Sequence, residues 1–550
     1  MLSNSAQFLL IAPPGWTLYS GGPHLAMPLL ASGLKSRGVD VTVRDLNAEI
    51  SAETARPIAV AEIIQACSGE SLRSMNDVYF ASQRPFETIA APYDAAWDLR
   101  LGFSYNEFSC FSSRQSLLAA DLESPFTSFY RQSVVPAVLE QQPDVVALGI
   151  ACIQQMVPAL QLCRVLREAG FRGLVVLGGN TISRIADTLT IPRLFQWVDA
   201  YAVYQGENTM MALAEVVMRG RDFATVPNVI WWDGTSAVSN PIANDVDADA
   251  VPTPCFDGLP LQLYWGAPFL PLLSARGCYH ARCAFCAIPY GWGRSRFGGT
   301  RSAERVYEDI VALVESHGIT NFKFVDESMP PATIRRLAQL LVSRGVRIKW
   351  EAYTRLEKAW GHSDLADIAA QSGFVKAYFG VELAPGENRL LLEKGDTVDP
   401  LPIFRRCREA GILVHMFAML GFPGTNANDA QRTVELAVEH VDPIDTLDIF
   451  SYGCARGTAV PAGVRLLRDP DLDWALEFPF EPSVGGVMGS QEVEDLANFY
   501  EEFVFEHYPR LVHPIYRLIS PWRTSEIDWR SLGLEDVPPA GRLQVEPRCR

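Results

Sequence analysis

Two series of strands alternating with helices run through the sequence and limit the folds it can adopt. In the first series, apolar strands such as residues 8–14 and 144–151 alternate with segments whose apolar residues recur at helical spacing. The second series starts near Phe269 and has six strands, with the sequences FLPLLSA, NFKFVDE, RIKWEAY, KAYFGVE, LVHMFAML and LDIFSYG. Near-continuous apolar strands separated by helices are typical of parallel sheets covered on both faces. We therefore predict an α/β protein.

These elements divide the chain into four predicted parts. Residues 1–220 form a Rossmann-like (flavodoxin-like) domain, interrupted at about 52–140 by an insertion rich in Phe, Tyr and Ser without a regular pattern. Residues 221–265 are a linker rich in Pro, Asp and Asn, and residues 266–465 hold the β-α units of a partial (β/α)6 barrel. A mainly helical extension over 466–550 completes the chain. The insertion either covers the ligand edge of the first sheet or recognises the substrate, and the aromatic residues of the extension either pack in a core or cap the substrate.

Charge and hydropathy exclude several classes of protein. With 47 basic and 64 acidic residues, the net charge of −17 repels phosphate backbones, so we expect no nucleic-acid partner. No apolar stretch approaches the roughly 18 residues of a membrane span, so we expect no membrane partner. The first residues lack the basic region of a secretion signal, and eleven cysteines is an odd count for a disulfide framework. We expect a cytoplasmic protein.

Three cysteines stand close together in the sequence RGCYHARCAFC, directly after the first strand of the second series. One interpretation is a Cys3His zinc site formed by Cys278, Cys283 and Cys286 with His280. Another is a loop of unligated thiols. Structural zinc is usually assembled from two short knuckles, however, whereas these four residues crowd one loop. Three thiolates without a fourth suit a [4Fe-4S] cluster with one iron open to a ligand. We therefore favour a catalytic cluster held by the three cysteines.

Polar residues and glycines follow the other strands, at the edge where parallel sheets bind ligands. In the second series these are Asp326-Glu327-Ser328, Arg355, Glu382, and the segment GFPGT with Gly421 and Pro423. In the first series they are Ala151-Cys152, Gly178-Gly179-Asn180 and Gly206-Glu207. Each polar residue has an alternative as a solvated strand end, and each glycine as a simple turn. We predict that these residues bind cofactors.

Together the motifs resemble those of the radical S-adenosylmethionine (SAM) enzymes, and within them the class B methyltransferases that carry a cobalamin-binding domain. The cysteine loop keeps the aromatic residue before its last cysteine, Phe285, but its first spacing is C-x4-C where the family usually has C-x3-C. The resemblance implies that Asp326-Glu327-Ser328 binds the methionine amino group of SAM and Arg355 its carboxylate. It also implies that Glu382 contacts the ribose, and residues 421–424 the adenine.

The resemblance also implies a cobalamin site in the first domain, at the segments LGGN and QGEN. Cobalamin domains that place a histidine on cobalt carry D-x-H-x-x-G. That sequence is absent here, and His24 is the only histidine before His280. The expected cofactor is therefore base-off cobalamin with no histidine ligand.

The chemistry of the family implies a function. One SAM molecule methylates reduced cobalamin, a second yields a 5′-deoxyadenosyl radical at the [4Fe-4S] cluster, and the resulting substrate radical takes the methyl group. We expect methylation of an unactivated carbon in a small-molecule or peptide natural product, with electrons from an external donor such as flavodoxin or ferredoxin. A cobalamin-dependent cyclisation or ring rearrangement is the alternative enzyme. A non-catalytic cobalamin or redox sensor is less favoured, because no output module is visible in the sequence.

Overall fold

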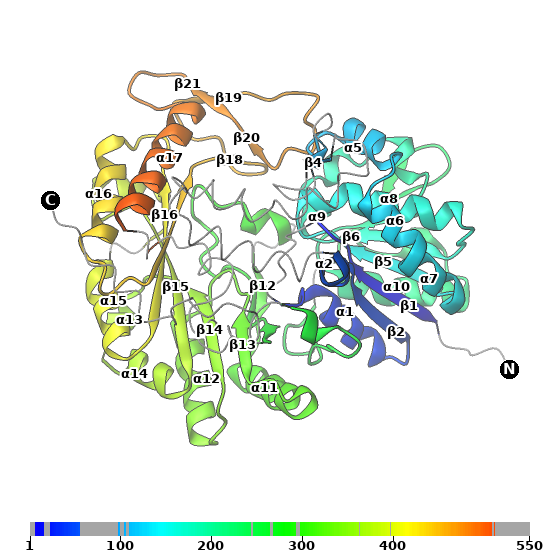
Figure 1. Ribbon diagram of the computed structural model, residues 1–550, viewed down its shortest axis with the longest axis horizontal. Coiled ribbons are helices and arrows are strands. Elements are labelled where there is room, and N and C mark those ends of the chain that lie inside the picture. The colour runs from blue at the N-terminus through cyan, green and yellow to red at the C-terminus, as the bar shows by residue number, and fades with distance from the viewer. Residues whose placement is uncertain are drawn as a thin grey trace.

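The computed structural model has two α/β bodies side by side (Figure 1). The first body comes from the N-terminal half of the chain and the second body from residues after about 268. The structure describes residues 6–15, 22–54, 97–98, 104–105, 109–243, 246–264, 268–292, 297–361, 363–395, 398–508 and 511.

A seven-stranded sheet forms the centre of the first body, in the order β2-β1-β5-β6-β7-β8-β9. The strands are β1 (Gln7–Ala12), β2 (Asp40–Asp45), β5 (Val145–Gly149), β6 (Leu174–Gly178), β7 (Ala200–Ala202), β8 (Val229–Trp232) and β9 (Ala237–Ser239). From β2 to β7 the strands are parallel, and β8 and β9 add an antiparallel edge. This edge comes from residues predicted to be a linker, so the first sheet extends further along the chain than the sequence indicates.

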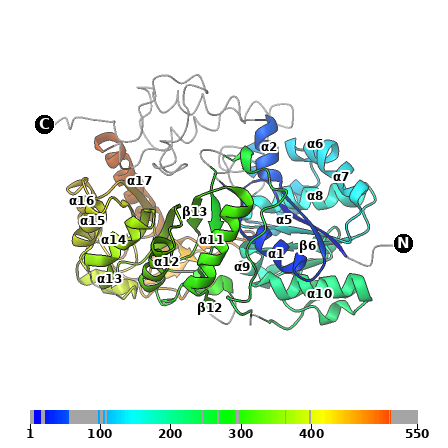
Figure 2. The same cartoon turned by 90° about the horizontal axis from the view of Figure 1, so that it is seen from below.

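Helices cover both faces of this sheet, because its strands are apolar on both sides. In β1, Phe8 and Leu10 share a buried cluster with α1 (Ala26–Lys35) and α10 (Gly206–Arg219), whereas Leu9 and Ile11 face the opposite helices. The opposite helices are α5 (Ser113–Ala120), α6 (Pro125–Phe129), α7 (Val135–Gln141) and α8 (Met156–Glu168). Figure 2 shows α6, α7 and α8 on one side and α10 on the other. The first body also contains α2 (Leu46–Thr54) and a small pair of strands, β3 (Trp97–Asp98) and β4 (Ser104–Tyr105).

Six parallel strands form the wall of the second body, in the order β10-β13-β14-β15-β16-β17. They are β10 (Leu270–Leu272), β13 (Asn321–Phe324), β14 (Lys349–Thr354), β15 (Phe374–Glu382), β16 (Leu413–Leu420) and β17 (Thr446–Ser451). Its helices are α11 (Ala303–His317), α12 (Pro331–Ser343), α13 (Lys358–Gly361), α14 (Ser363–Gln371), α15 (Pro400–Glu409) and α16 (Ala427–Val438). The predicted α/β class, with a Rossmann-like sheet followed by a partial barrel, is confirmed.

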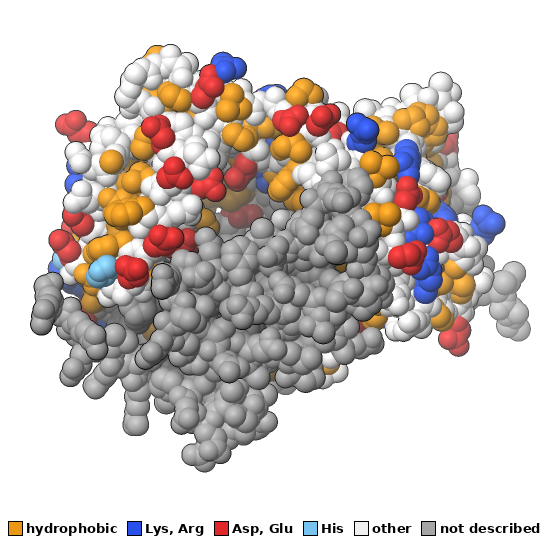
Figure 3. Space-filling model, turned by 45° about the horizontal axis from the view of Figure 1, so that its top comes forward, with side chains coloured by type: hydrophobic (Ala, Val, Ile, Leu, Met, Phe, Trp, Pro, Cys, Tyr) orange, Lys and Arg blue, Asp and Glu red, His pale blue; other side chains and the backbone are white. Residues whose placement is uncertain are grey.

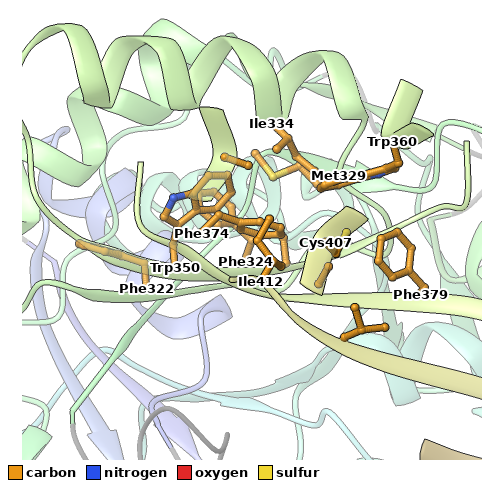
Figure 4. Packing of buried hydrophobic residues seen from close by; sticks show 14 of the residues in the cluster. Phe322, Phe324, Met329, Ile334, Trp350, Trp360, Phe374, Phe379, Cys407 and Ile412 are labelled. Carbon is orange, nitrogen blue, oxygen red and sulfur yellow. The ribbon is translucent and has the colours of Figure 1, made fainter. Parts of the chain in front are cut away.

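Aromatic side chains between this wall and its helices hold the strands in place (Figure 4). Phe322, Trp350 and Phe374 are almost completely buried, and the rings of Trp350 and Phe374 lie 4.5 Å apart between centroids. The indole N–H of Trp350 donates a hydrogen bond of 3.1 Å to the hydroxyl of Ser372. Burying one such side chain contributes about 2–3 kcal/mol to folding. The strand ends, where ligand-binding residues were predicted, therefore project from a firmly packed wall.

The chain after β17 reaches back over both bodies. Here β18 (Cys454–Ala455) pairs with β20 (Glu477–Phe478), β19 (Val464–Leu466) pairs with β21 (Phe480–Pro482), and α17 (Ser490–His507) follows. We call residues 453–482 the strap, which lies across the top of Figure 1. Arg456 of the strap lies 2.7 and 2.9 Å from the carboxylate oxygens of Asp187 in the first body. Trp474 is fully buried within the core of the first body. The strap therefore ties the two bodies together.

The hydropathy of the helices and the surface charge bear on contact with membranes and nucleic acids. Among the described residues, no helix combines the length and the apolar character needed to cross a membrane. On the face drawn in Figure 3, basic side chains of the first body are interspersed with acidic ones, and acidic side chains predominate over the second body. The described part of that face carries no continuous basic stripe. The absence of a nucleic-acid partner stays a prediction.

Candidate active site

A cavity of about 840 Å³ lies between the two bodies, where the carboxyl ends of both sheets meet. The first body contributes the ends of β5, β6 and β7 together with the start of α1 and α10, and the second contributes the cysteine loop and the ends of β15 and β17. The predicted site residues that line this cavity are Ala151, Gly178, Gly179, Asn180, Gly206, Glu207, Phe285, Cys286, Glu327 and Glu382. Residues from both halves of the sequence thus share one space.

The cysteine loop begins after β11 (Ala275–Gly277), which pairs with β12 (Phe297–Thr300). Cys278, Cys283 and Cys286 are all half-buried, and burial raises the pKa of the Cys286 thiol to about 12. No three His, Cys, Asp or Glu side chains in the described part of the chain are arranged to hold a single metal ion. This arrangement gives no support to the Cys3His zinc alternative. In a [4Fe-4S] cluster each thiolate binds a different iron, so the thiolates need not meet around one ion.

Arg355 lies behind the cysteine loop, outside the lining of the cavity. Its guanidinium is buried, donates to the carbonyl of Lys394, and lies 3.6 Å from the carboxylate of Glu357. The hydroxyl of Tyr279, next to Cys278 in the loop, donates to the same carboxylate. The Nε atom of Arg355 has no hydrogen-bond partner among the described residues. Arg355 therefore braces the loop, with its Nε atom facing the Glu357 carboxylate at a distance too long for a hydrogen bond.

Glu382 ends β15 at an irregular position of the sheet. Its φ of 63° lies in the left-handed region, where a residue other than glycine is strained. Lys394 donates a hydrogen bond of 2.5 Å to its carboxylate, and the ammonium of Lys394 lies 5.8 Å from the ring centre of Phe285. Such strain often occurs at functional sites, and here it places a carboxylate at the cavity wall beside the cysteine loop.

Asp326, Glu327 and Ser328 follow β13 but point in different directions. Asp326 is buried and accepts hydrogen bonds of 3.0 and 2.9 Å from the backbone N–H of Ser274, so it ties β13 to the segment after β10. Glu327 is exposed to the cavity, where desolvation by the surrounding walls and the neighbouring Asp326 raise the pKa of its carboxyl to about 7. The hydroxyl of Ser328 is buried without a hydrogen-bond partner in the described structure. Only Glu327 of the three lines the cavity.

Gly421 and Pro423 lie outside the cavity lining. Gly421 has a φ of 81°, and a Cβ atom there would come within 2.3 Å of Val493 in α17. The close approach at this glycine therefore serves the packing of α17 against the barrel. Cys152 is likewise outside the lining, with its thiol 3.8 Å from the carbonyl of Gly15.

The glycine loops of the first body form a shallow cradle at the cavity. Gly179 has a φ of 112°, and a Cβ atom there would lie 2.4 Å from the carbonyl oxygen of Ile150. Gln205, directly before Gly206, is buried, and its amide oxygen has no hydrogen-bond partner among the described residues. Backbone that only glycine can form and an unpaired acceptor are features that fit a large amide-bearing ligand such as cobalamin.

An ion pair joins the two bodies across the cavity. The guanidinium of Arg276 donates to both carboxylate oxygens of Glu207, and the Nη1–Oε2 distance is 3.1 Å. The two side chains are only 7% and 17% exposed. Arg276 belongs to β11, directly before the cysteine loop, and Glu207 begins α10. Glu207, predicted to contact a cofactor, therefore also links the two halves of the site.

Several lining residues were not singled out by the sequence. They are Arg184, Tyr204, Tyr452 and Glu477. Tyr204 directly precedes the QGEN segment, and Tyr452 follows the last barrel strand, so the strand-end rule would have found these two. Arg184 lies at the end of α9 (Asn180–Arg184) and Glu477 in the strap, and no local signal marks either.

Comparisons with known proteins find one matching family model and several similar structures. Residues 272–437 match the family model of the radical SAM superfamily. The structure of the radical SAM methyltransferase TsrM from Kitasatospora setae, with cobalamin and a [4Fe-4S] cluster bound, has a TM-score of 0.59 and 15% identity, covering 95% of this chain and 94% of that chain. A second TsrM structure, with tryptophan substrate and a SAM analogue, has a TM-score of 0.53 and 15% identity, covering 95% and 90%.

A larger enzyme shares the same architecture. The cobalamin-dependent SAM radical enzyme OxsB, with aqua-cobalamin and SAM bound, has a TM-score of 0.54 and 14% identity, covering 94% of this chain and 58% of that chain. No curated protein matches the chain in sequence. The predicted radical SAM domain is confirmed, and the two bodies together share their fold with the TsrM and OxsB structures.

Proposed function

We propose that this chain, which contains a radical SAM domain, is a cobalamin-dependent radical SAM methyltransferase that methylates an unactivated carbon of a small-molecule or peptide natural product. One observation carries the proposal: the cysteine loop and the glycine cradle line the same cavity. A methyltransferase of this kind needs its substrate between two cofactors, and a shared cavity provides such a position.

The second body would hold the cluster and SAM. The thiolates of Cys278, Cys283 and Cys286 would ligate a [4Fe-4S] cluster, and Phe285 would cover it from the cavity side. Glu327 and Glu382 are the carboxylates that SAM would meet first, because both line the cavity beside the loop. The remaining predicted SAM contacts do not line the cavity and would support the bound SAM from positions further from it. They are Asp326, Ser328, Arg355, Gly421 and Pro423.

The first body would hold cobalamin in its base-off form. The cradle of Gly178, Gly179 and Asn180 would take the nucleotide tail, with Ala151, Cys152, Gly206 and Glu207 around it. His24 is the only histidine among the described residues that line the cavity, and its Nδ1 atom accepts a hydrogen bond of 3.4 Å from the backbone of Ala26. We propose that no histidine binds the cobalt, a prediction that electron paramagnetic resonance of the cob(II) protein checks through the absence of nitrogen hyperfine splitting.

When bound, the cofactors would supply the methyl group and the hydrogen abstraction, with two SAM molecules consumed per turnover. The tasks of the protein are to orient substrate between them and to exclude water. The Arg276–Glu207 pair and the strap, which join the bodies around the cavity, serve these tasks. A flavodoxin or ferredoxin in the cytoplasm would supply the electrons.

Products separate this function from its alternatives. With methyl-labelled SAM, a methyltransferase releases both S-adenosylhomocysteine and 5′-deoxyadenosine and adds one labelled methyl group to its product, all measured by mass spectrometry. Cys278→Ala, Cys283→Ala and Cys286→Ala should each lose the cluster, the formation of 5′-deoxyadenosine and the methylation of the substrate, whereas Cys255→Ala, outside the loop, should retain all three. Formation of 5′-deoxyadenosine without S-adenosylhomocysteine or a heavier product would establish the cyclisation or ring-rearrangement alternative.

A further inference from the structure

The end of the cavity under the strap holds a cation and an anion that lack partners of opposite charge. Arg184, at the end of α9, and Glu477, in β20, both line the cavity, yet neither forms an ion pair with any described residue. Other charged groups nearby are satisfied: Arg456 pairs with Asp187, and Arg276 pairs with Glu207. Arg184 is half-buried and Glu477 is exposed toward the cavity, so a ligand that carries a charge of each sign can pair with both of them there.

The surroundings of Arg184 leave part of its guanidinium unused. Its Nη2 atom donates a hydrogen bond of 2.8 Å to the carbonyl of Leu476 in the strap, which fixes the orientation of the side chain. Its Nε atom is buried and has no hydrogen-bond partner among the described residues. Burial lowers the pKa of Arg184, and the nearby Glu477 carboxylate opposes that shift, so the two groups are close without forming an ion pair. A fixed guanidinium with a free donor is suited to bind a carboxylate.

A third polar group points to the same ligand. Tyr452 is 3% exposed, and its buried hydroxyl has only the weakly hydrogen-bonding thiol of Cys454 beside it, with no oxygen or nitrogen partner in the described part of the chain. Its ring is held between Phe422 and Phe480, at centroid distances of 5.0 and 5.5 Å, so the hydroxyl cannot easily turn toward solvent. Tyr452 lines the cavity beside Gly453, where a Cβ atom would lie 2.6 Å from a carboxylate oxygen of Glu477. A buried hydroxyl of this kind is costly unless a ligand completes its hydrogen bonds.

We propose that this end of the cavity binds the substrate through an ammonium group and a carboxylate, as found together in a free α-amino acid or in a product that retains both groups. Arg184 and the Tyr452 hydroxyl donate to the carboxylate, and Glu477 accepts from the ammonium. A zwitterion carries one negative and one positive group, so its carboxylate pairs with Arg184 and its ammonium pairs with Glu477 when it binds. This inference rests on the proposed function, since it names the class of substrate that the same cavity takes.

Binding to the holoprotein, with its cluster and cobalamin in place, tests the proposal. The probes are the proteinogenic L-amino acids, each compared with its N-acetyl amide, and the readout is the change in melting temperature followed by titration calorimetry of any ligand found. We expect at least one free amino acid to stabilise the protein and its N-acetyl amide to have no effect. Arg184→Gln and Glu477→Gln should each weaken that binding by roughly 10- to 100-fold, as expected for loss of a charged hydrogen bond.

Two controls separate the possible outcomes. Arg468→Gln removes a guanidinium that lines the adjoining cavity but not this one, and it should leave the affinity for the amino acid unchanged. The phosphodiester of cobalamin is a second anion that could bind to Arg184. A spectrophotometric titration with cobalamin measures that binding separately. The proposal is overturned if no free amino acid stabilises the holoprotein, or if Arg184→Gln weakens cobalamin binding and leaves amino-acid binding unchanged. Failure of the proposed function has a different signature, because amino-acid binding would then persist without methyl transfer.

Discussion

The Arg276–Glu207 ion pair predicts a measurable coupling between the two bodies. At 3.1 Å and an effective dielectric constant of about 20, the attraction between the two charges is about 5 kcal/mol. Desolvation of two side chains that are 7% and 17% exposed offsets about half of it, which leaves a coupling of about 2–3 kcal/mol. Glu207→Gln and Arg276→Gln should each lower the free energy of unfolding, and the double variant should lose less than the sum of the two.

Urea unfolding of the apoprotein, followed by tryptophan fluorescence, measures this coupling as a double-mutant cycle. The apoprotein is the suitable form because Arg276 is close to Cys278, and changes in cluster content would otherwise contribute. The exposed pair Arg465–Glu481 in the strap, with side chains 65% and 44% exposed, is the matched control and should show a coupling below about 1 kcal/mol. A coupling below about 0.5 kcal/mol for Arg276 and Glu207 would refute the reasoning, because it would mean that water already screens the pair.

The glycine cradle and the cavity histidine give two further predictions. Gly179→Ala should reduce cobalamin affinity at least 10-fold in a spectrophotometric titration, because its Cβ would meet the Ile150 carbonyl at 2.4 Å; Gly170→Ala, with a φ of 90° but open space around it, should bind cobalamin normally. Burial lowers the pKa of His24 to about 4 from an ordinary value near 6.5, so its contribution to stability is complete above pH 6.5 and is lost as the pH falls toward 4. Between pH 6.5 and 4, the free energy of unfolding of the wild-type apoprotein should fall by up to about 3 kcal/mol more than that of the His24→Gln apoprotein. Equal pH profiles of the two proteins in urea unfolding would contradict this.

Much of the fold follows from local patterns in the sequence. Apolar runs such as residues 8–14 and 144–151 identify parallel strands because only sheets buried on both faces need them. The β8–β9 hairpin was assigned to a linker, although VIWW and AVS flank an Asp233-Gly234 turn that is typical of hairpins. The surrounding Pro and Asp residues outweighed that short signal.

The candidate site was predictable where it lies at strand ends and hidden where it depends on distant contacts. Gly179 and Glu382 could be selected because they follow strands, and both line the cavity. Gly421 follows a strand too, but its neighbour is Val493, far along the chain, which turns the position into a packing contact. Arg184 and Glu477 are 293 residues apart in the sequence, and neither belongs to a recognisable motif. Only the tertiary structure brings them to one cavity.

Trp474 has a consequence for how this protein can be divided. Although it lies in the strap, after the whole barrel, it is one of the fully buried side chains in the core of the first body, and its backbone N–H donates to the carbonyl of Phe111. A fragment cut near residue 264 would therefore lack an indole that its own interior is shaped to enclose, and removing such a side chain from a core typically costs about 3–5 kcal/mol. The N-terminal half is a domain by topology but not an exchangeable module, so chimaeras that swap it between related chains would have to carry the matching strap with it.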